Sequence, residues 1–320
     1  VTGMFQLGNF GDGVRLGTST SDGGGRLWQS GGWEHQVLDN LISGNGNAGV
    51  LVACFDCLLE GNTIGTDLDG TAAIGNAAMG VYVSGVTGAV VQRNLVSANG
   101  AAGIVIDTYY HSPASNNEIL GNMIGTDSAG AAALGNTGHG VVIAGDDNTV
   151  GPTVEGEGNL ISANGGDGIA IGGSMGLAFR NQVVGNLIGT DGTGTLALGN
   201  GGDGVSVCCG DNLVGGTDPD SGNVIAASGD DGVHMSAMWG GNKVQGNAIG
   251  TDASGTLDLG NTDHGVEVNG VPEALIGGVE PTAGNAIAFN GGAGVVVDFS
   301  GLEVAIQSNA IYSNTGLGID

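Results

Sequence analysis

A 16-residue string that occurs four times limits what this chain can fold into. It reads GNTIGTDLDGTAAIGN where it begins at Gly61, and close copies begin at Gly121, Gly185 and Gly246. The intervals between these starts are 60, 64 and 61 residues. A steady period of this size is typical of a solenoid, in which each unit stacks on the one before it. We therefore predict one continuous repeat domain over residues 1–320.

A second, shorter string alternates with the first. Two of its copies are Asn94-Leu-Val-Ser-Ala-Asn99 and Asn159-Leu-Ile-Ser-Ala-Asn164. Each copy precedes a short apolar run such as Gly168-Ile-Ala-Ile171. Each period of about 60 residues therefore holds two coils, one with a long Gly-Thr-Asp turn and one with a short Ser-Ala-Asn turn.

The spacing of the apolar residues predicts short strands rather than helices. Runs such as Gly140–Ile143 and Gly265–Val268 have the two-residue period of strands and are bounded by Gly, Asn and Asp. Three such strands per coil, each stacked on its counterpart in the next coil, give a parallel β-helix. We predict an all-β, right-handed parallel β-helix of about ten to eleven coils, because parallel crossovers are nearly always right-handed. The recurring Asn residues should form inward ladders of amides at the corners.

Composition restricts the partners of the chain. Only 4% of the residues are aromatic, so the core must be stacked aliphatic side chains. The formal charge is −27, from 32 acidic residues against five Lys and Arg. Nucleic acid, anionic lipid and polyuronic acids all require a basic surface and are excluded as partners, whereas cations and neutral glycans are not. No apolar run is long enough to insert into a membrane.

Two segments depart from the repeat. Residues 17–36 carry Trp28 and Trp33, and a shorter insertion carries Tyr109 and Tyr110. Aromatic insertions on a rigid scaffold can bind a ligand. The alternative, which we prefer, is a flap that covers a coil edge. Both ends of the chain stop inside a coil, which indicates either a segment of a longer protein or subunits that continue the helix end to end.

The two repeated strings, GNxIGTDxxGTxALGN and NxISxNGGDGVxI, resemble the right-handed parallel β-helix repeats of large secreted and surface-anchored bacterial proteins. The resemblance covers nearly the whole chain outside residues 17–36. It implies an extracellular or cell-surface location in a bacterium and an array that is one part of a longer exported chain. It implies no particular activity.

One column of residues lies just before the glycine that opens the first strand of each coil. It includes His139, Asp167, Asp203, Asp231 and His264. Because neighbouring coils stack about 4.8 Å apart, we expect a row of carboxylates flanked by imidazoles. Such a row can divide acid and base roles or share a divalent cation. The simpler interpretation, which we prefer, is that an Asp-Gly turn opens each strand for local hydrogen-bonding reasons.

The aspartates of the long turns form a second series. They are Asp67, Asp127, Asp191 and Asp252. They lie two coils apart, about 10 Å, which is too far for one shared ion. Each carboxylate can cap its own turn or join the turn's carbonyls in a calcium site. We expect capping and no cofactor, with calcium as the alternative.

The four cysteines occur as two pairs. Cys54 and Cys57 are far in sequence from Cys208 and Cys209, and about five coils, or roughly 25 Å, separate the pairs. One zinc ion therefore cannot bind all four. Each pair is predicted to form a local disulfide, as suits an oxidising compartment, with reduced pairs in a cytosolic protein as the alternative.

These features support two functional hypotheses. The first is a structural or adhesive β-helical rod outside the cell that associates end to end or with neighbouring segments of a longer chain. The second is a carbohydrate-active enzyme that acts on a neutral polysaccharide at His139, Asp167, Asp203, Asp231 and His264. Tyr109, Tyr110 or Trp239 would then be stacking platforms for sugar rings. From the sequence we expect the rod rather than the enzyme.

Overall fold

The computed structural model describes residues 8–17, 19–21, 27–29, 33–109, 112–152, 158–172, 177–236, 239–298 and 303–320. Of the predicted ligand-binding aromatics, Tyr110 lies outside these residues, and only the backbone of Trp28 is described. Among the described residues there is no helix of the length and apolar character needed to cross a bilayer.

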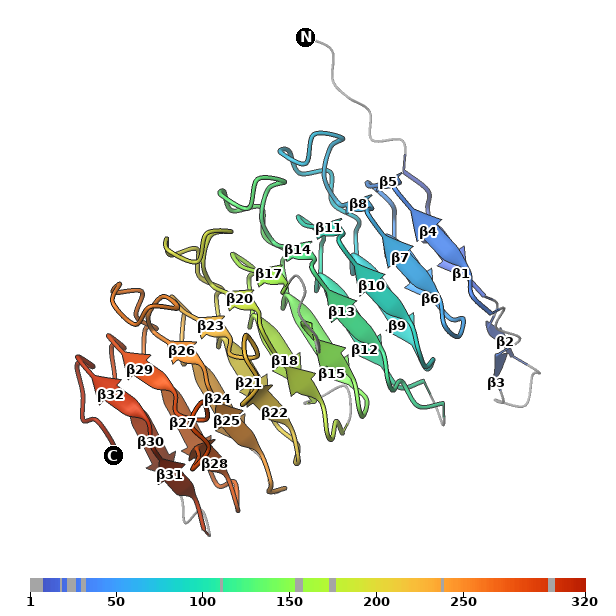
Figure 1. The fold of residues 1–320 in the computed structure, drawn as a ribbon. Coiled ribbons are helices and arrows are strands. Elements are labelled where there is room, and N and C mark those ends of the chain that lie inside the picture. The colour runs from blue at the N-terminus through green and yellow to red at the C-terminus, as the bar shows by residue number, and fades with distance from the viewer. Residues whose placement is uncertain are drawn as a thin grey trace.

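The chain winds as a right-handed parallel β-helix of about ten coils, as predicted. Each coil visits three parallel sheets of ten strands in turn (Figure 1). The first sheet consists of β1 (Val14–Leu16), β6 (Val50–Val52), β9 (Val81–Ser84), β12 (Ile104–Asp107), β15 (Val141–Ala144), β18 (Ile169–Ile171), β21 (Val205–Val207), β24 (Val233–Ser236), β27 (Val266–Asn269) and β30 (Val295–Asp298).

The other two sheets follow the same order along the axis. The second consists of β4 (Gln36–Leu38), β7 (Leu58–Glu60), β10 (Val90–Gln92), β13 (Glu118–Leu120), β16 (Thr149–Val150), β19 (Gln182–Val183), β22 (Leu213–Gly215), β25 (Lys243–Gln245), β28 (Leu275–Gly277) and β31 (Ala305–Gln307). The third consists of β5 (Leu41–Ile42), β8 (Thr63–Ile64), β11 (Leu95–Val96), β14 (Met123–Ile124), β17 (Leu160–Ile161), β20 (Leu187–Ile188), β23 (Val224–Ile225), β26 (Ala248–Ile249), β29 (Ala286–Ala288) and β32 (Ala310–Tyr312).

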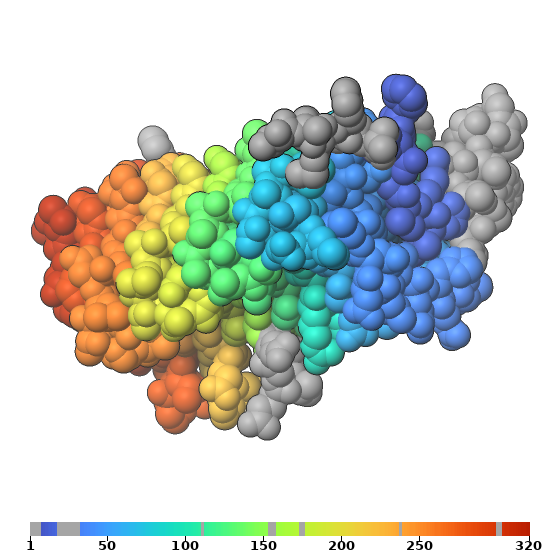
Figure 2. Space-filling view, turned by 90° about the horizontal axis from the view of Figure 1, so that it is seen from above, coloured from blue at the N-terminus to red at the C-terminus, as the bar shows by residue number. Residues whose placement is uncertain are grey.

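Within residues 17–36, β2 (Ser19–Ser21) pairs antiparallel with β3 (Leu27–Gln29). This hairpin is the part of the insertion that departs from the solenoid. In the space-filling view the successive colours follow one another along the long axis of the molecule (Figure 2). Residues far apart in sequence therefore become neighbours when they are one coil apart, or two coils apart at the long turns.

The core consists of straight files of aliphatic side chains. In the third sheet the same inward position is fully buried in coil after coil, and its occupants pair in register. They are Ile64, Val96, Ile124, Ile161, Ile188, Ile225, Ile249 and Ile287. Burial of one apolar side chain per strand per coil is the main source of stability in such a stack.

The predicted asparagine ladders are present at the corners. In the ladder before the third sheet, Asn94 donates both its backbone N–H and its side-chain amide to Oδ1 of Asn122, at 2.9 and 3.0 Å. Asn122 repeats both bonds to Asn159. Each buried amide thus satisfies the backbone of the coil before it, and this fixes the register of neighbouring coils.

A second ladder, on the far side of the third sheet, is broken at one position. Asn164 donates to Oδ1 of Asn200 at 3.0 Å, but the next coil has Ser228 where the other coils have asparagine. The buried Ser228 hydroxyl has no hydrogen-bond partner in the described part of the chain. The backbone N–H of Ser228 resumes the ladder at Asn261.

The four long turns follow β8, β14, β20 and β26 and project from one edge of the helix (Figure 1). Three of them are linked by backbone hydrogen bonds across two coils. The N–H of Ser128 donates to the carbonyl of Gly70 at 3.0 Å, and that of Gly192 donates to Gly130 at 2.8 Å. The turns therefore form their own stack beside the main helix.

Candidate active site

The predicted row of carboxylates and imidazoles is continuous in the structure. Asp167 donates its N–H to Nδ1 of His139 at 3.0 Å, and Asp203 donates to Oδ1 of Asp167 at the same distance. Asp231 donates to Oδ1 of Asp203 at 3.1 Å, and His264 to Oδ1 of Asp231 at 2.8 Å. The hydrogen bonding of these side chains therefore runs between neighbouring coils, as in the asparagine ladders, and not within a local Asp-Gly turn as expected. It occupies one oxygen of each carboxylate and leaves Oδ2 for other contacts.

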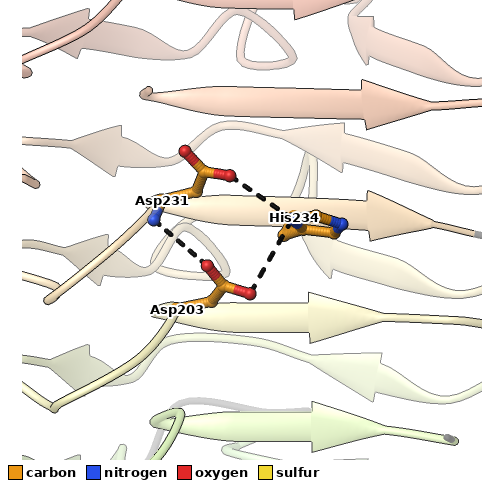
Figure 3. A group of neighbouring side chains, drawn as sticks. All are labelled: Asp203, Asp231 and His234. Carbon is orange, nitrogen blue, oxygen red and sulfur yellow. Dashed lines mark hydrogen bonds and ion pairs between the residues drawn. The ribbon is translucent and has the colours of Figure 1, made fainter. Parts of the chain in front are cut away.

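A third imidazole, that of His234, contacts the row from the outer face of the first sheet. Nδ1 of His234 lies 2.9 Å from Oε2 of Glu267, 3.4 Å from Oδ2 of Asp231 and 3.9 Å from Oδ2 of Asp203. Figure 3 shows both aspartate side chains turned toward the ring. A single ring nitrogen therefore faces three carboxylates, so the cluster carries more negative than positive charge.

His234 and Glu267 are not among the site residues predicted from the sequence. Both point outward from β24 and β27, and they are direct neighbours in the register of these strands. The signal was available in the two-residue period of the strands, since Val233 and Met235 are buried on either side of His234. An outward position on one strand, however, stands next to the corner column only once the coils are stacked.

Burial and charge move the pKa values of the cluster apart. Burial, with the adjacent Asp167 charge, raises the pKa of Asp203 to about 7. The hydrogen bond to Asp231 is the main cause that raises the pKa of His234 to about 9. Burial also raises the pKa of Glu267, whereas the hydrogen bond from His234 keeps the pKa of the buried Asp231 low. One carboxyl group thus stays protonated near neutral pH while its neighbour is ionised.

The exposed fractions of the three aspartate side chains show which carboxylates can contact a ligand. The Asp231 side chain is only 3% exposed, whereas those of Asp203 and Asp167 are 13% and 19% exposed. Asp167 and Asp203 also belong to adjacent coils. They are therefore the pair that a molecule lying on the outer face of the first sheet would contact.

Two groups of side chains have the geometry to hold a metal ion. The ligand atoms of Asp203, Asp231 and His234 all lie within 4.8 Å of one another, and so do those of Asp231, Asp263 and His264. A set of carboxylate oxygens with one imidazole nitrogen fits a transition metal better than calcium.

The predicted aromatic platforms are spread over the molecule. Trp33, which precedes β4, is 67% exposed and lies 5.2 Å from the ring of Phe55. Tyr109 follows β12 and is half-buried. Trp239 follows β24 and packs edge-on against Phe179 at 5.6 Å. Trp33 is several coils from the row of carboxylates and imidazoles, which begins at His139, just before β15.

The aspartates of the long turns cap those turns. Oδ1 of Asp67 accepts the N–H groups of Thr71 and Ala72 at 2.8 and 3.0 Å, and Oδ1 of Asp252 accepts those of Thr256 and Leu257, both at 2.9 Å. The other two long turns repeat the contact at Asp127 and Asp191. Calcium binding at these turns stays a prediction.

The two cysteine pairs differ. Cys54 and Cys57 form a disulfide, which joins the end of β6 to the start of β7. The prediction of a second disulfide, between Cys208 and Cys209, is wrong: their Sγ atoms lie 3.6 Å apart, too far for an S–S bond of about 2.05 Å, and share a hydrogen bond instead. Burial raises the pKa of Cys209 to about 11, so this thiol stays protonated at neutral pH.

Comparisons with known proteins agree with the fold. A family model described as right handed beta helix region matches residues 9–188. The solved structures that are similar include two Azotobacter vinelandii mannuronan C-5 epimerase modules. The AlgE4 A-module is 15% identical, with 89% of this chain and 57% of that chain covered and a TM-score of 0.35. The AlgE6 A-module is 17% identical, with 90% and 77% covered and a TM-score of 0.37.

The chain thus spans a little over half of the length of the AlgE4 module. A likeness at these TM-scores carries no functional argument. No curated protein matches the sequence.

Proposed function

Since the chain belongs to the right-handed β-helix family, we propose that it is a carbohydrate-active enzyme that hydrolyses a neutral polysaccharide on the outer face of the first sheet. The observation that carries this proposal is the pair Asp167 and Asp203. These carboxyl groups are partly exposed and adjacent, and the pKa of Asp203 is raised to about 7. A protonated carboxyl group beside an ionised one is what glycoside hydrolysis requires.

The roles of the two groups follow from the raised pKa of Asp203 and from the exposure of Asp167. Asp203 donates its proton to the glycosidic oxygen as the bond to the leaving sugar breaks. Asp167 attacks the anomeric carbon and forms a glycosyl ester, which water then cleaves with Asp203 as the base. Adjacent coils are about 4.8 Å apart, close to the roughly 5 to 5.5 Å between carboxyl groups in retaining enzymes. The product should therefore keep the anomeric configuration of the substrate.

The rest of the cluster supports this pair and restricts the substrate. His234 keeps Asp231 ionised, whereas burial and the Asp167 charge hold the proton on Asp203 and the nearby His234 partly opposes them. The surplus of carboxylates would repel uronic acids. A neutral glycan is the substrate class that is compatible with this negative charge.

Hydrolysis of a panel of neutral polysaccharides tests the proposal. The release of reducing ends should appear with at least one of them and should fall by about a hundredfold or more in Asp203→Asn, as expected on loss of a general acid. Asp218→Asn, which changes an exposed aspartate outside the row, is the matched control and should keep full activity. No turnover on any neutral glycan, or full activity in Asp203→Asn, would reject the enzyme.

A second candidate function is a structural rod. Three ten-stranded sheets and the uninterrupted asparagine ladder before the third sheet favour stiffness along the axis. In this role the protein would lie outside a bacterial cell and associate end to end or with neighbouring segments of a longer chain. The Cys54–Cys57 disulfide supports an oxidising compartment for either role. Electron microscopy tests the rod, which predicts filaments with an axial repeat of about 50 Å for ten coils.

A further inference from the structure

The outer face of the first sheet is unusually apolar where it approaches the row. Outward positions on a solvated sheet face are normally polar. Here five consecutive coils place apolar or aromatic side chains at the same outward position, and these pair in register. They are Leu51, Tyr82, Val105, Val142 and Ala170. The same file then continues through Ser206 to His234 in the charged cluster.

Val105, Val142 and Ala170 of this file line an open hollow beside Asp167. Its volume is about 400 Å³. Met79, Ala102, Val105 and Val142 line it, and His139 and Asp167 form its border with the row. Although they point outward, Val105 and Val142 are only 3% and 7% exposed. A ligand held by Asp167 would therefore extend directly against apolar side chains.

The lining indicates what kind of group occupies the hollow. On one side its walls are methyl, isopropyl and thioether groups from Met79, Ala102, Val105 and Val142, whereas polar groups line the other side, from His139, Asp167, Ser206 and Cys208. A charged substituent placed against the apolar side would lose its hydration without gaining a partner there. A compact aliphatic group would instead release water from apolar surface on both sides.

We propose that the substrate of this site is a neutral glycan that carries a compact aliphatic substituent, and that this substituent packs against the apolar side of the hollow beside Asp167. An O-acyl ester, an O-methyl ether and the methyl group of a 6-deoxy sugar share this chemistry. The inference rests on the proposed function, because it is the pair Asp167 and Asp203 that places the sugar next to the hollow.

Two alanine variants test the hollow through catalysis. Ala102 lines it, whereas Ala293 occupies the same corner column several coils away, and their exposures are similar at 8% and 4%. Wild-type protein should prefer an O-acetylated neutral oligosaccharide over its deacylated form by about tenfold to a hundredfold in kcat/KM. Ala102→Leu should lose this preference and Ala293→Leu should keep it. The O-methyl and 6-deoxy oligosaccharides identify which substituent the hollow prefers.

A binding measurement separates the hollow from catalysis. In methyl NMR spectra, O-acetylated glucose, O-methylated glucose and glucose itself should shift the Val142 signal in the order of their aliphatic character. Val142→Thr, which is isosteric, should weaken binding of the substituted sugars. The matched Val296→Thr, an equally buried outward position of the same sheet, should not.

The outcomes separate the two proposals. Binding at Val142 without any glycan turnover would reject the enzyme and keep the hollow as a binding site. Turnover with equal kcat/KM for substituted and plain glycans, or shifts that avoid Val142, would reject the hollow. Equal effects of Ala102→Leu and Ala293→Leu would also overturn it, provided that both variants melt near the wild-type temperature.

Discussion

Asp203 keeps its proton up to about neutral pH in the folded protein, and this affects the stability of the fold. Its pKa is raised from 3.8 to about 7 in the folded state. Between these two pH values the folded protein keeps a proton that the unfolded chain has lost, so the free energy of unfolding falls as pH rises and stays low above pH 7. The burial of this carboxyl group therefore costs stability at the pH where the group is useful.

Asp203→Asn should remove that cost. The amide oxygen can still accept the N–H of Asp231, while the ionisable group is gone. We expect the variant to be more stable than wild type above pH 7, by at most about 4 kcal/mol, and equal to it below pH 4. Urea denaturation at both pH values measures this. The Asp218→Asn control should show no pH-dependent difference, and a variant that gains nothing at pH 8 would place the pKa of Asp203 near its usual value.

Ser228 is a defect in a buried ladder, and replacing it should stabilise the protein. Elsewhere in this ladder a glycine leaves room for the asparagine amide, as Gly232 does for Asn261. Gly204 leaves the same space beside Ser228. Ser228→Asn should restore the hydrogen bonds at Asn200 and add about 1 kcal/mol to the free energy of unfolding. Thermal melting checks this against Ser228→Thr, which lacks the amide, and a lower melting temperature in the asparagine variant would show that the site is too small.

At the scale of the element, the long turns depend on their aspartates. Asp252 closes its turn through the N–H groups of Thr256 and Leu257 and the hydroxyl of Ser254. Asp252→Ala should lower the free energy of unfolding by about 1 kcal/mol, because three donors of the turn lose their acceptor. Asp69→Ala, an exposed aspartate of the first long turn, is the control.

The Asp252→Ala variant also distinguishes an aspartate that only caps its turn from one that binds calcium. Because the Asp252 carboxylate already accepts several hydrogen bonds, we expect the same loss of stability in calcium and in a chelator. If the loss is larger in calcium than in the chelator, the turn binds the ion. Guanidinium denaturation in both buffers gives the comparison.

The elements show why the fold was predictable and the full site was not. Recurring strings such as Asn94–Asn99 mark the same corner in every coil, and alignment of the coils on these strings places Asp167, Asp203 and Asp231 in one row. The contact of His234 with that row depends instead on the offset between a strand and the preceding corner. The low exposure of outward residues such as Val142 depends on their neighbours in adjacent coils, and no single coil contains that information.

At the scale of the whole molecule, the stacking of the coils brings the corner residues of separate coils together into one site. A single Asp-Gly corner is an ordinary turn. Three of them in consecutive coils, with His234 and Glu267 added from the sheet face, form a cluster in which one carboxyl group must keep its proton. The same stacking forms the hollow from coils that carry one small side chain each.

A carbon-13 NMR titration of the aspartate carboxyl groups tests this account most directly. With assignments from Asp203→Asn, the row should titrate as a coupled set, with Asp203 losing its proton near pH 7 and Asp231 remaining ionised far below that pH. If Asp203 instead titrates near pH 4, like an exposed aspartate, the row has no proton to donate at neutral pH and the proposed hydrolysis fails.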